Sequence, residues 1–310
     1  YTDQGTHYFT DKAKGTSVRK KYINFASTGS FNSTLYQTSS ATNDLTFISG
    51  STATTNGVNN AFTFEADIMV PYRAPADEKA FLGVPFMLSS IFGFHQVKDE
   101  QDPGDYTWAT SDDTNLQVYL LRDKLYSTRG KFVLKNQDSS IYLTSSYFEN
   151  IYDNNHWNVA IRIKPDTYPY AGGVTNTDPP GTIEFYGVNC NFDRVENQFL
   201  LTASLTPTLT DKYLTYPKRV YAGAHKTNFT GSTLEKSDLQ IGAIRVWFDY
   251  LDNQAIIQHN KDPLNFGNNK AFRGSNVFTM DNVKIPSQEL TVFNWDFDTV
   301  TTSDSSGDFV

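Results

Sequence analysis

DLQIGAIRVWFDYLDNQAIIQHNKDPL, residues 238–264, carries the clearest structural signal in the chain. Residues 239–248 alternate apolar side chains, many of them β-branched or aromatic, which predicts one long buried strand or two short ones. Asp252 can accept a hydrogen bond from a backbone N–H two or three residues on, so a short helix is expected from Asn253 to about His259. Pro263 then ends it. The stretch predicts a strand, an abrupt turn and a short helix over the sheet edge.

The composition of the whole chain favours strands. Its 310 residues include 18 Tyr and 23 Phe, and long runs of Ala, Leu, Glu and Lys at helical spacing are missing. The net charge is −8, which argues against nucleic acid as the main partner because phosphate binding needs a surplus of Lys and Arg. We therefore expect an all-β protein whose partners are neighbouring modules or subunits of a larger assembly.

Features outside the core suggest where such a protein works. No apolar run approaches the roughly 20 residues of a membrane-spanning helix, so we expect no membrane-spanning helix. Cys190 is the only cysteine, which fits folding in a reducing cytosol followed by display outside, as in virion proteins. The chain begins at Tyr1 without an initiator Met or a signal segment, which we interpret as a processed product or part of a longer polypeptide. The expected location is a virion or an extracellular surface.

Three short motifs resemble those of laminin-G-like domains. They are Ile241-Gly242-x-Ile244 with the aromatic run 247–250, the Trp157-led strand at 154–163, and the Gly-containing strand at 181–188. Such domains belong to the concanavalin-A-like lectin and glucanase superfamily. The resemblance implies an antiparallel jelly-roll sandwich of two sheets with one short helix near residues 252–260.

On this basis the chain divides into three parts. Residues 1–21 are locally basic and form an N-terminal arm, and residues 22–265 form the jelly roll with a long insertion at about 71–115. Residues 266–310 form a C-terminal extension, either a strand that returns to the sandwich or the start of a following module. The small residues of 221–224 and 241–244 suggest two neighbouring antiparallel strands.

Residues 62–70 alternate as a half-buried strand and place Glu65 and Asp67 together on its polar face. Glycosidases of the superfamily that the chain resembles carry a third carboxylate on such a strand, and here it would fall on Met69 or Val70. Retaining hydrolysis needs a proton donor about 5 Å from the nucleophile, and this strand supplies none. We interpret Glu65 and Asp67 as exposed polar residues and assign no catalytic residue.

An acidic loop is the candidate metal site. Oxygen-rich loops bind Ca²⁺, and domains of the superfamily that the chain resembles often carry one calcium at the sandwich rim. A solvated acidic loop explains the same residues, and because no EF-hand spacing is present we favour no metal and no other cofactor. The acids concerned are Asp99, Asp102, Asp105, Asp112 and Asp113.

Three aromatic residues in polar loops are the candidate sugar-binding residues. Tyr168 and Tyr170 lie in a Pro- and Gly-rich hairpin loop, and a hairpin of this type puts its tip at the sandwich rim. They either stack on a sugar ring or pack at the rim. Trp108 is either a plug under its loop or a ligand platform. His156, beside Trp157, is interpreted as a turn-capping histidine.

No phosphate loop, nucleophilic Ser elbow or zinc helix occurs in the sequence. The leading hypothesis is a non-enzymatic structural or recognition module of a larger extracellular or virion protein, such as a phage capsid or tail appendage, with glycans as candidate ligands. The alternative is a glycoside hydrolase or lyase on the same sandwich, which would combine Glu65 or Asp67 with an acid from another strand.

Overall fold

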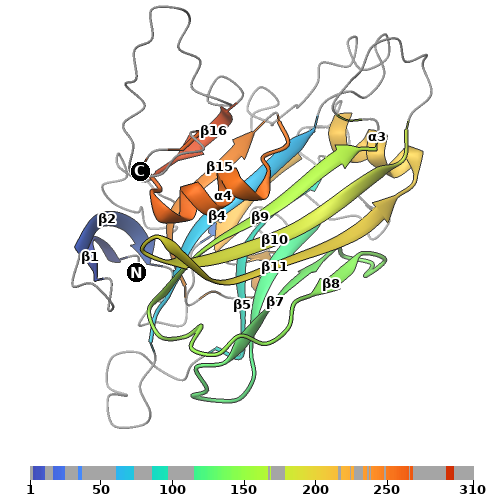
Figure 1. Ribbon diagram of the computed structural model, residues 1–310. Helices are drawn as coiled ribbons and strands as arrows, with labels where there is room; N and C mark the ends of the chain where they lie inside the picture. The colour runs from blue at the N-terminus through green and yellow to red at the C-terminus, as the bar shows by residue number, and fades with distance from the viewer. Residues whose placement is uncertain are drawn as a thin grey trace, which may run out of the picture.

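The computed structural model shows strands β1 to β16 and helices α3 and α4 among its described residues (Figure 1). The described residues are 3–10, 17–24, 34–36, 61–72, 86–96, 115–166, 168, 179–215, 218–223, 225–226, 233–235, 237, 239–247, 249–264, 266–267 and 291–296. Within them the chain is mostly strand, with antiparallel pairing in two large sheets, so the predicted all-β sandwich is confirmed. No helix in these ranges is long and apolar enough to cross a membrane.

The larger sheet has eight strands in the order β1-β2-β15-β4-β9-β10-β11, and β16 also pairs with β15. The order shows that β2 and β16 share one edge of β15, while β4 occupies the other. These strands are β1 (Asp3–Thr10), β2 (Ser17–Asn24), β4 (Phe62–Val70), β9 (Asn155–Pro165), β10 (Gly181–Asn191), β11 (Arg194–Leu205), β15 (Gln240–Trp247) and β16 (Thr291–Trp295).

The smaller sheet has six strands in the order β3-β12-β5-β6-β7-β8, and a separate hairpin pairs β13 with β14. The bounds are β3 (Thr34–Tyr36), β5 (Leu88–Gln96), β6 (Leu116–Arg122), β7 (Gly130–Lys135), β8 (Tyr142–Thr144), β12 (Lys218–Gly223), β13 (His225–Lys226) and β14 (Thr233–Glu235). The expectation that 221–224 and 241–244 pair is wrong, because β12 lies in this sheet and β15 in the other. Gly242 instead falls at a register shift in the β15–β4 ladder, a position typical of a bulge.

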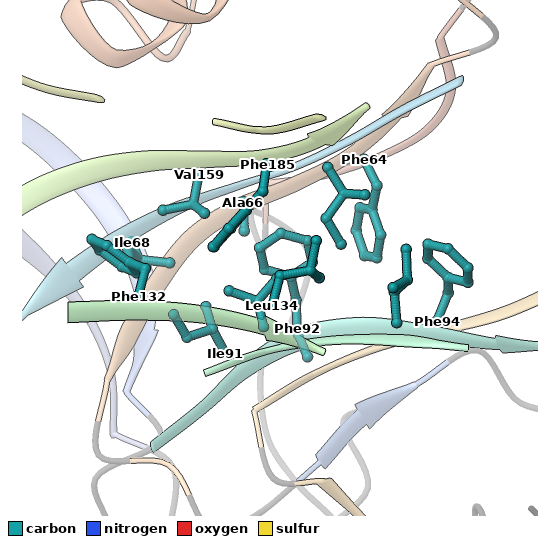
Figure 2. Close-up of a cluster of buried hydrophobic side chains, with 14 of the residues drawn as sticks. Phe64, Ala66, Ile68, Ile91, Phe92, Phe94, Phe132, Leu134, Val159 and Phe185 are labelled. Carbon is teal, nitrogen blue, oxygen red and sulfur yellow. The ribbon is translucent and has the colours of Figure 1, made fainter. Parts of the chain in front are cut away.

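The core lies between the two sheets. Figure 2 shows inward side chains of β4 and β9 meeting those of β5 and β7. Phe64 contacts Phe92 edge-to-face with ring centroids 4.6 Å apart, an arrangement that aromatic quadrupoles favour. Phe132 packs on Trp157 at 4.9 Å. The alternation in β4 and β9 therefore faces the way the sequence predicted.

The described part of the chain includes two short helices, α3 and α4. α4 (Asn253–Lys261) is the predicted helix, and Asp252 caps it because its Oδ1 accepts a hydrogen bond from Ala255 N at 2.8 Å. α4 contacts β9 and β10, so it crosses the outer face of the larger sheet and not its edge as expected (Figure 1). α3 (Pro207–Thr215) was not predicted; its Tyr213 reaches the core.

The division into arm, jelly roll and extension stays a prediction. The arm already carries β1 and most of β2, and β16 lies in the proposed extension and pairs with β15. Most of the proposed insertion at 71–115 lies outside the described residues.

Candidate functional site

The outer face of the larger sheet holds a layer of polar side chains beneath α4. Glu65 and Asp67 point to this face from β4, yet they are 1% and 0% exposed. The interpretation of these two residues as exposed is therefore wrong. The two carboxylates are buried because α4 and the residues after it cover this strand face, which would be exposed to solvent in a two-sheet sandwich without the helix.

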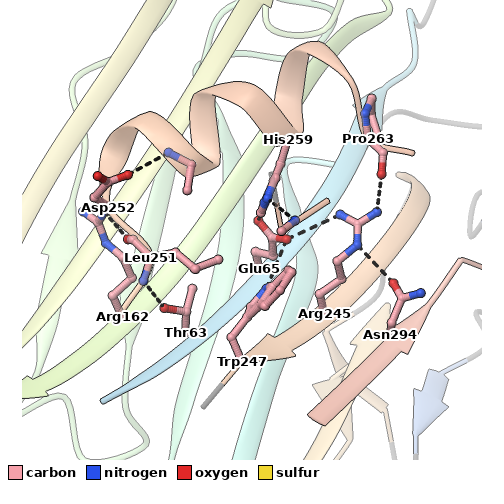
Figure 3. Close-up of polar contacts among 12 residues, drawn as sticks. Thr63, Glu65, Arg162, Arg245, Trp247, Leu251, Asp252, His259, Pro263 and Asn294 are labelled. Atoms are coloured by element: carbon pink, nitrogen blue, oxygen red, sulfur yellow. Dashed lines mark hydrogen bonds and ion pairs between the residues drawn. The ribbon is translucent and has the colours of Figure 1, made fainter. Parts of the chain in front are cut away.

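Glu65 is the centre of this polar layer (Figure 3). Its Oε1 accepts hydrogen bonds from Arg245 Nη1 at 3.4 Å and from Trp247 Nε1 at 3.2 Å. Its Oε2 lies 3.0 Å from His259 Nδ1. Strands β4 and β15 supply three of these groups and α4 supplies the fourth, so the carboxylate joins the helix to the sheet.

Arg245 and His259 extend the polar layer to the chain beyond α4. Arg245 donates to the carbonyl of Pro263 at 2.6 Å and to Asn294 Oδ1 on β16 at 3.0 Å. His259 Nε2 accepts from the backbone N–H of Gly267 at 2.9 Å, which assigns the remaining proton to Nδ1, facing Glu65. Arg245 and His259 are thus hydrogen-bonded to other groups of the protein.

The pKa of Glu65 follows from these contacts. Burial alone would raise it, but His259, Arg245 and Trp247 together outweigh burial and lower the pKa to about 2. Burial lowers the pKa of Arg245, against the attraction of Glu65. Glu65 is therefore held as a carboxylate and cannot deliver a proton near neutral pH.

Asp67 and His156 form a second contact beneath the same C-terminal end of α4. His156 Nε2 hydrogen-bonds to Asp67 Oδ1, and Nδ1 of the same ring lies 3.3 Å from the Asn260 amide. His156 thus bridges β4 and α4, and the turn-capping role predicted for it is wrong. The pattern offered no signal for this contact, because Asp67 and His156 are 89 positions apart.

A surface cluster of tyrosines lies at the opposite end of the sheet, beside the start of α4. Tyr168 donates its hydroxyl proton to Asp249, and its ring centroid lies 6.2 Å from that of Tyr250. Tyr250 donates to Glu184 Oε2 at 2.8 Å, and Lys164 lies 4.1 Å from the Tyr250 ring centroid. We call Lys164, Tyr168, Glu184, Asp249 and Tyr250 the tyrosine cluster.

A buried arginine supports the tyrosine cluster from below. Arg162 forms an ion pair with Glu184 at 2.7 Å and donates to the carbonyl of Leu251 at 2.9 Å. Its guanidinium lies 4.9 Å from the Tyr250 ring centroid and 5.0 Å from that of Tyr186, distances at which cation–π attraction operates. Two cations, Arg162 and Lys164, therefore contact the Tyr250 ring, which helps to hold it in place.

The tyrosine hydroxyls remain donors over the whole physiological range. Burial, followed by the hydrogen bond to Asp249, raises the pKa of Tyr168 to about 12. Burial also raises the pKa of Tyr250 to about 12, opposed by Arg162 and assisted by Glu184. Both rings are only half-buried, so they combine fixed orientation with access to solvent.

The neighbouring edge strand β11 continues this surface. Its outward residues are exposed, and Thr202 lies opposite Glu184 while Leu200 lies opposite Tyr186 in the β10–β11 register. Leu200 is 46% exposed. The tyrosine cluster thus borders an open strip of sheet.

The predicted binding residues have different outcomes. Tyr168 lies in the tyrosine cluster, whereas Tyr170 and Trp108 lie outside the described residues, as do Asp99, Asp102, Asp105, Asp112 and Asp113. Within the described ranges no group of three or more His, Cys, Asp or Glu side chains is placed to hold a metal ion.

Sequence reasoning missed Lys164, Glu184, Asp249 and Tyr250 as site residues. The available signal was charge inside apolar strands, because Lys164 and Glu184 interrupt the otherwise hydrophobic runs of β9 and β10. A charged residue in a buried strand requires a polar partner. Tyr250, which lies two residues before the predicted helix cap Asp252, is the partner of both Lys164 and Glu184.

Comparison with known proteins gives weak likenesses. No family model and no curated protein matches the chain. Tailspike protein 2 of Escherichia coli O157:H7 bacteriophage CAB120 is similar over 84% of this chain and 27% of its own, with 13% identity and a TM-score of 0.39. The CBM40 of the Ruminococcus gnavus IT-sialidase matches over 73% of this chain and 94% of its own (10% identity, TM-score 0.31), and a legume lectin-like domain from Entamoeba histolytica over 81% and 90% (8% identity, TM-score 0.32).

Proposed function

We propose that this chain is a non-enzymatic recognition module that binds glycans through the tyrosine cluster. The observation that carries the proposal is a pair of half-buried tyrosine rings, each held by a carboxylate, with a lysine beside them on an open sheet face. Sugar rings offer a flat apolar face and a rim of hydroxyls. Fixed aromatic rings with a few converging polar groups match both.

The polar groups of the cluster suit hydroxyl recognition. Among the described residues, the hydrogen bonds from Tyr168 and from the Tyr250 amide both end on Asp249 Oδ1, so Oδ2 is the oxygen left for a ligand hydroxyl. Lys164 is 28% exposed and contacts Glu184 at 3.2 Å, so its ammonium group retains donors for a second hydroxyl.

The polar layer supports a non-enzymatic role. A glycosidase acid must carry a proton at working pH and reach the glycosidic oxygen. Glu65 has a pKa of about 2 and is covered by α4, and Asp67 is fully buried. We further propose that the chain is a module of a larger extracellular or virion assembly. The single cysteine, Cys190, and the acidic net charge are both compatible with that location.

A glycan array tests the proposal. Wild type is expected to bind a subset of glycans, and Tyr168→Ala or Lys164→Gln should weaken that binding about tenfold, the usual cost of a central interface residue. Tyr72→Ala and Lys124→Gln are matched controls, because both residues are exposed and lie outside the cluster. Unchanged binding in Tyr168→Ala would contradict the site. Release of reducing sugar that disappears in Glu65→Gln would overturn the non-enzymatic assignment.

A further inference from the structure

A second surface, on the smaller sheet, concentrates positive charge and aromatic rings. β7 and β8 form the end of that sheet, away from α4 (Figure 1). Their outward side chains include Lys131 and Lys135 on β7 and Tyr142 on β8, and Arg129 and Tyr147 adjoin them. We call these five residues the β7–β8 patch.

The β7–β8 patch is built as two tyrosine–lysine pairs. Lys131 Nζ lies 5.0 Å from the ring centroid of Tyr147, and Arg129 Cζ lies 4.8 Å from the same centroid. Lys135 lies directly opposite Tyr142 in the β7–β8 register. The two lysines are four positions apart on one strand, which separates the pairs by roughly 13 Å.

Within the described residues the two lysines differ from Arg129 in having no carboxylate partner. Arg129 is paired with Glu149 at 2.9 Å and approaches Asp123 at 3.6 Å. Among the residues that the structure describes, no carboxylate lies within ion-pair distance of Lys131 or Lys135. The chain has a net charge of −8, so two lysines without a described acidic partner, beside a tyrosine that is 55% exposed, form a locally positive surface within the described part of the chain.

We propose that the β7–β8 patch binds an acidic polysaccharide whose negative groups are carboxylates. Sugar rings would lie on Tyr142 and Tyr147, while carboxylates about 13 Å apart along the polymer would meet Lys135 and Lys131. The spacing requires an extended ligand rather than a single small anion. Nucleic acid is disfavoured because its dense phosphates need many more cations than this surface offers, and Glu149 and Asp123 border the patch.

This site is independent of the tyrosine cluster, which lies on the other sheet. Calorimetric titration of the full chain with polygalacturonate at low salt is the test, with dextran as the neutral polysaccharide and single-stranded poly(U) as the nucleic acid. We expect polygalacturonate to bind, dextran and poly(U) not to bind, and the affinity to fall as salt is raised because the contacts are exposed ion pairs.

Variants locate the binding. Lys131→Gln/Lys135→Gln should weaken polygalacturonate binding about tenfold, the combined effect of two exposed ion pairs, whereas Lys131→Arg/Lys135→Arg should retain it. Arg194→Gln, an exposed cation on β11, and Tyr168→Ala in the tyrosine cluster should leave it unchanged. Absent binding, equal binding of dextran or poly(U), or a loss in Tyr168→Ala that the Lys131→Gln/Lys135→Gln variant does not share would each overturn the proposal.

Discussion

The two faces of β4 are both buried, yet they are built from different chemistry. The inner face carries Phe62, Phe64, Ala66 and Ile68, and the outer face carries Glu65 and Asp67. Figure 2 shows Phe64, Ala66 and Ile68 facing the smaller sheet, and Figure 3 shows Glu65 beneath α4. Apolar contacts between sheets are non-directional, whereas each polar group under α4 needs a partner in the right place. The inner face therefore stabilises the sandwich, and the outer face fixes where α4 lies.

Removing a ring from the inner face should have the largest effect. Phe64→Ala is expected to cost about 4 kcal/mol of unfolding free energy, because Phe64 is fully buried and packs on Phe92 and Phe94. Urea denaturation measures it, with Tyr142→Ala on the surface as the control. A cost below about 1 kcal/mol would mean that the core between the sheets is loosely packed.

Breaking the polar layer should come next. Glu65→Gln leaves Arg245 buried without its carboxylate, and loss of one partner of a buried pair costs roughly 3 kcal/mol. Glu149→Gln, an exposed acid paired with Arg129, should cost less than about 1 kcal/mol. Equal costs for the two variants would show that burial under α4 gives Glu65 no special weight.

The same carboxylate predicts acid sensitivity. Its folded pKa of about 2 lies below its ordinary value of 4.5, so its stabilising contribution is complete above about pH 4.5 and is lost as the pH falls toward 2. Thermal melts across this range should show a steeper loss of stability for wild type than for Glu65→Gln. Parallel curves for the two proteins would contradict the assignment.

The helix cap gives a smaller effect. Asp252→Ala removes the bond to Ala255 N and should cost about 1 kcal/mol, while Asp252→Asn should restore most of it. Hydrogen exchange of the α4 amides measures this locally. Faster exchange confined to α4 is expected, and faster exchange spread through β4 would show that the cap does more than hold the helix.

The sequence predicted the inner face better than the outer one, for a physical reason. Alternation along β4 and the cap at Asp252 are local patterns, and both are confirmed. The contact of Glu65 with His259 spans 194 positions, and that of Tyr168 with Asp249 spans 81. Which polar residues become buried depends on where α4 docks, and nothing in the strand itself encodes that.

The central claim is that the tyrosine cluster recognises a ligand while the polar layer only supports the fold. The most direct test is the dissociation constant of the best array glycan for folded Tyr168→Ala and folded Glu65→Gln, measured well below their melting temperatures. The account predicts a rise of about tenfold in Tyr168→Ala and a change within about twofold in Glu65→Gln. Unchanged affinity in Tyr168→Ala, together with lost affinity in folded Glu65→Gln, would contradict it.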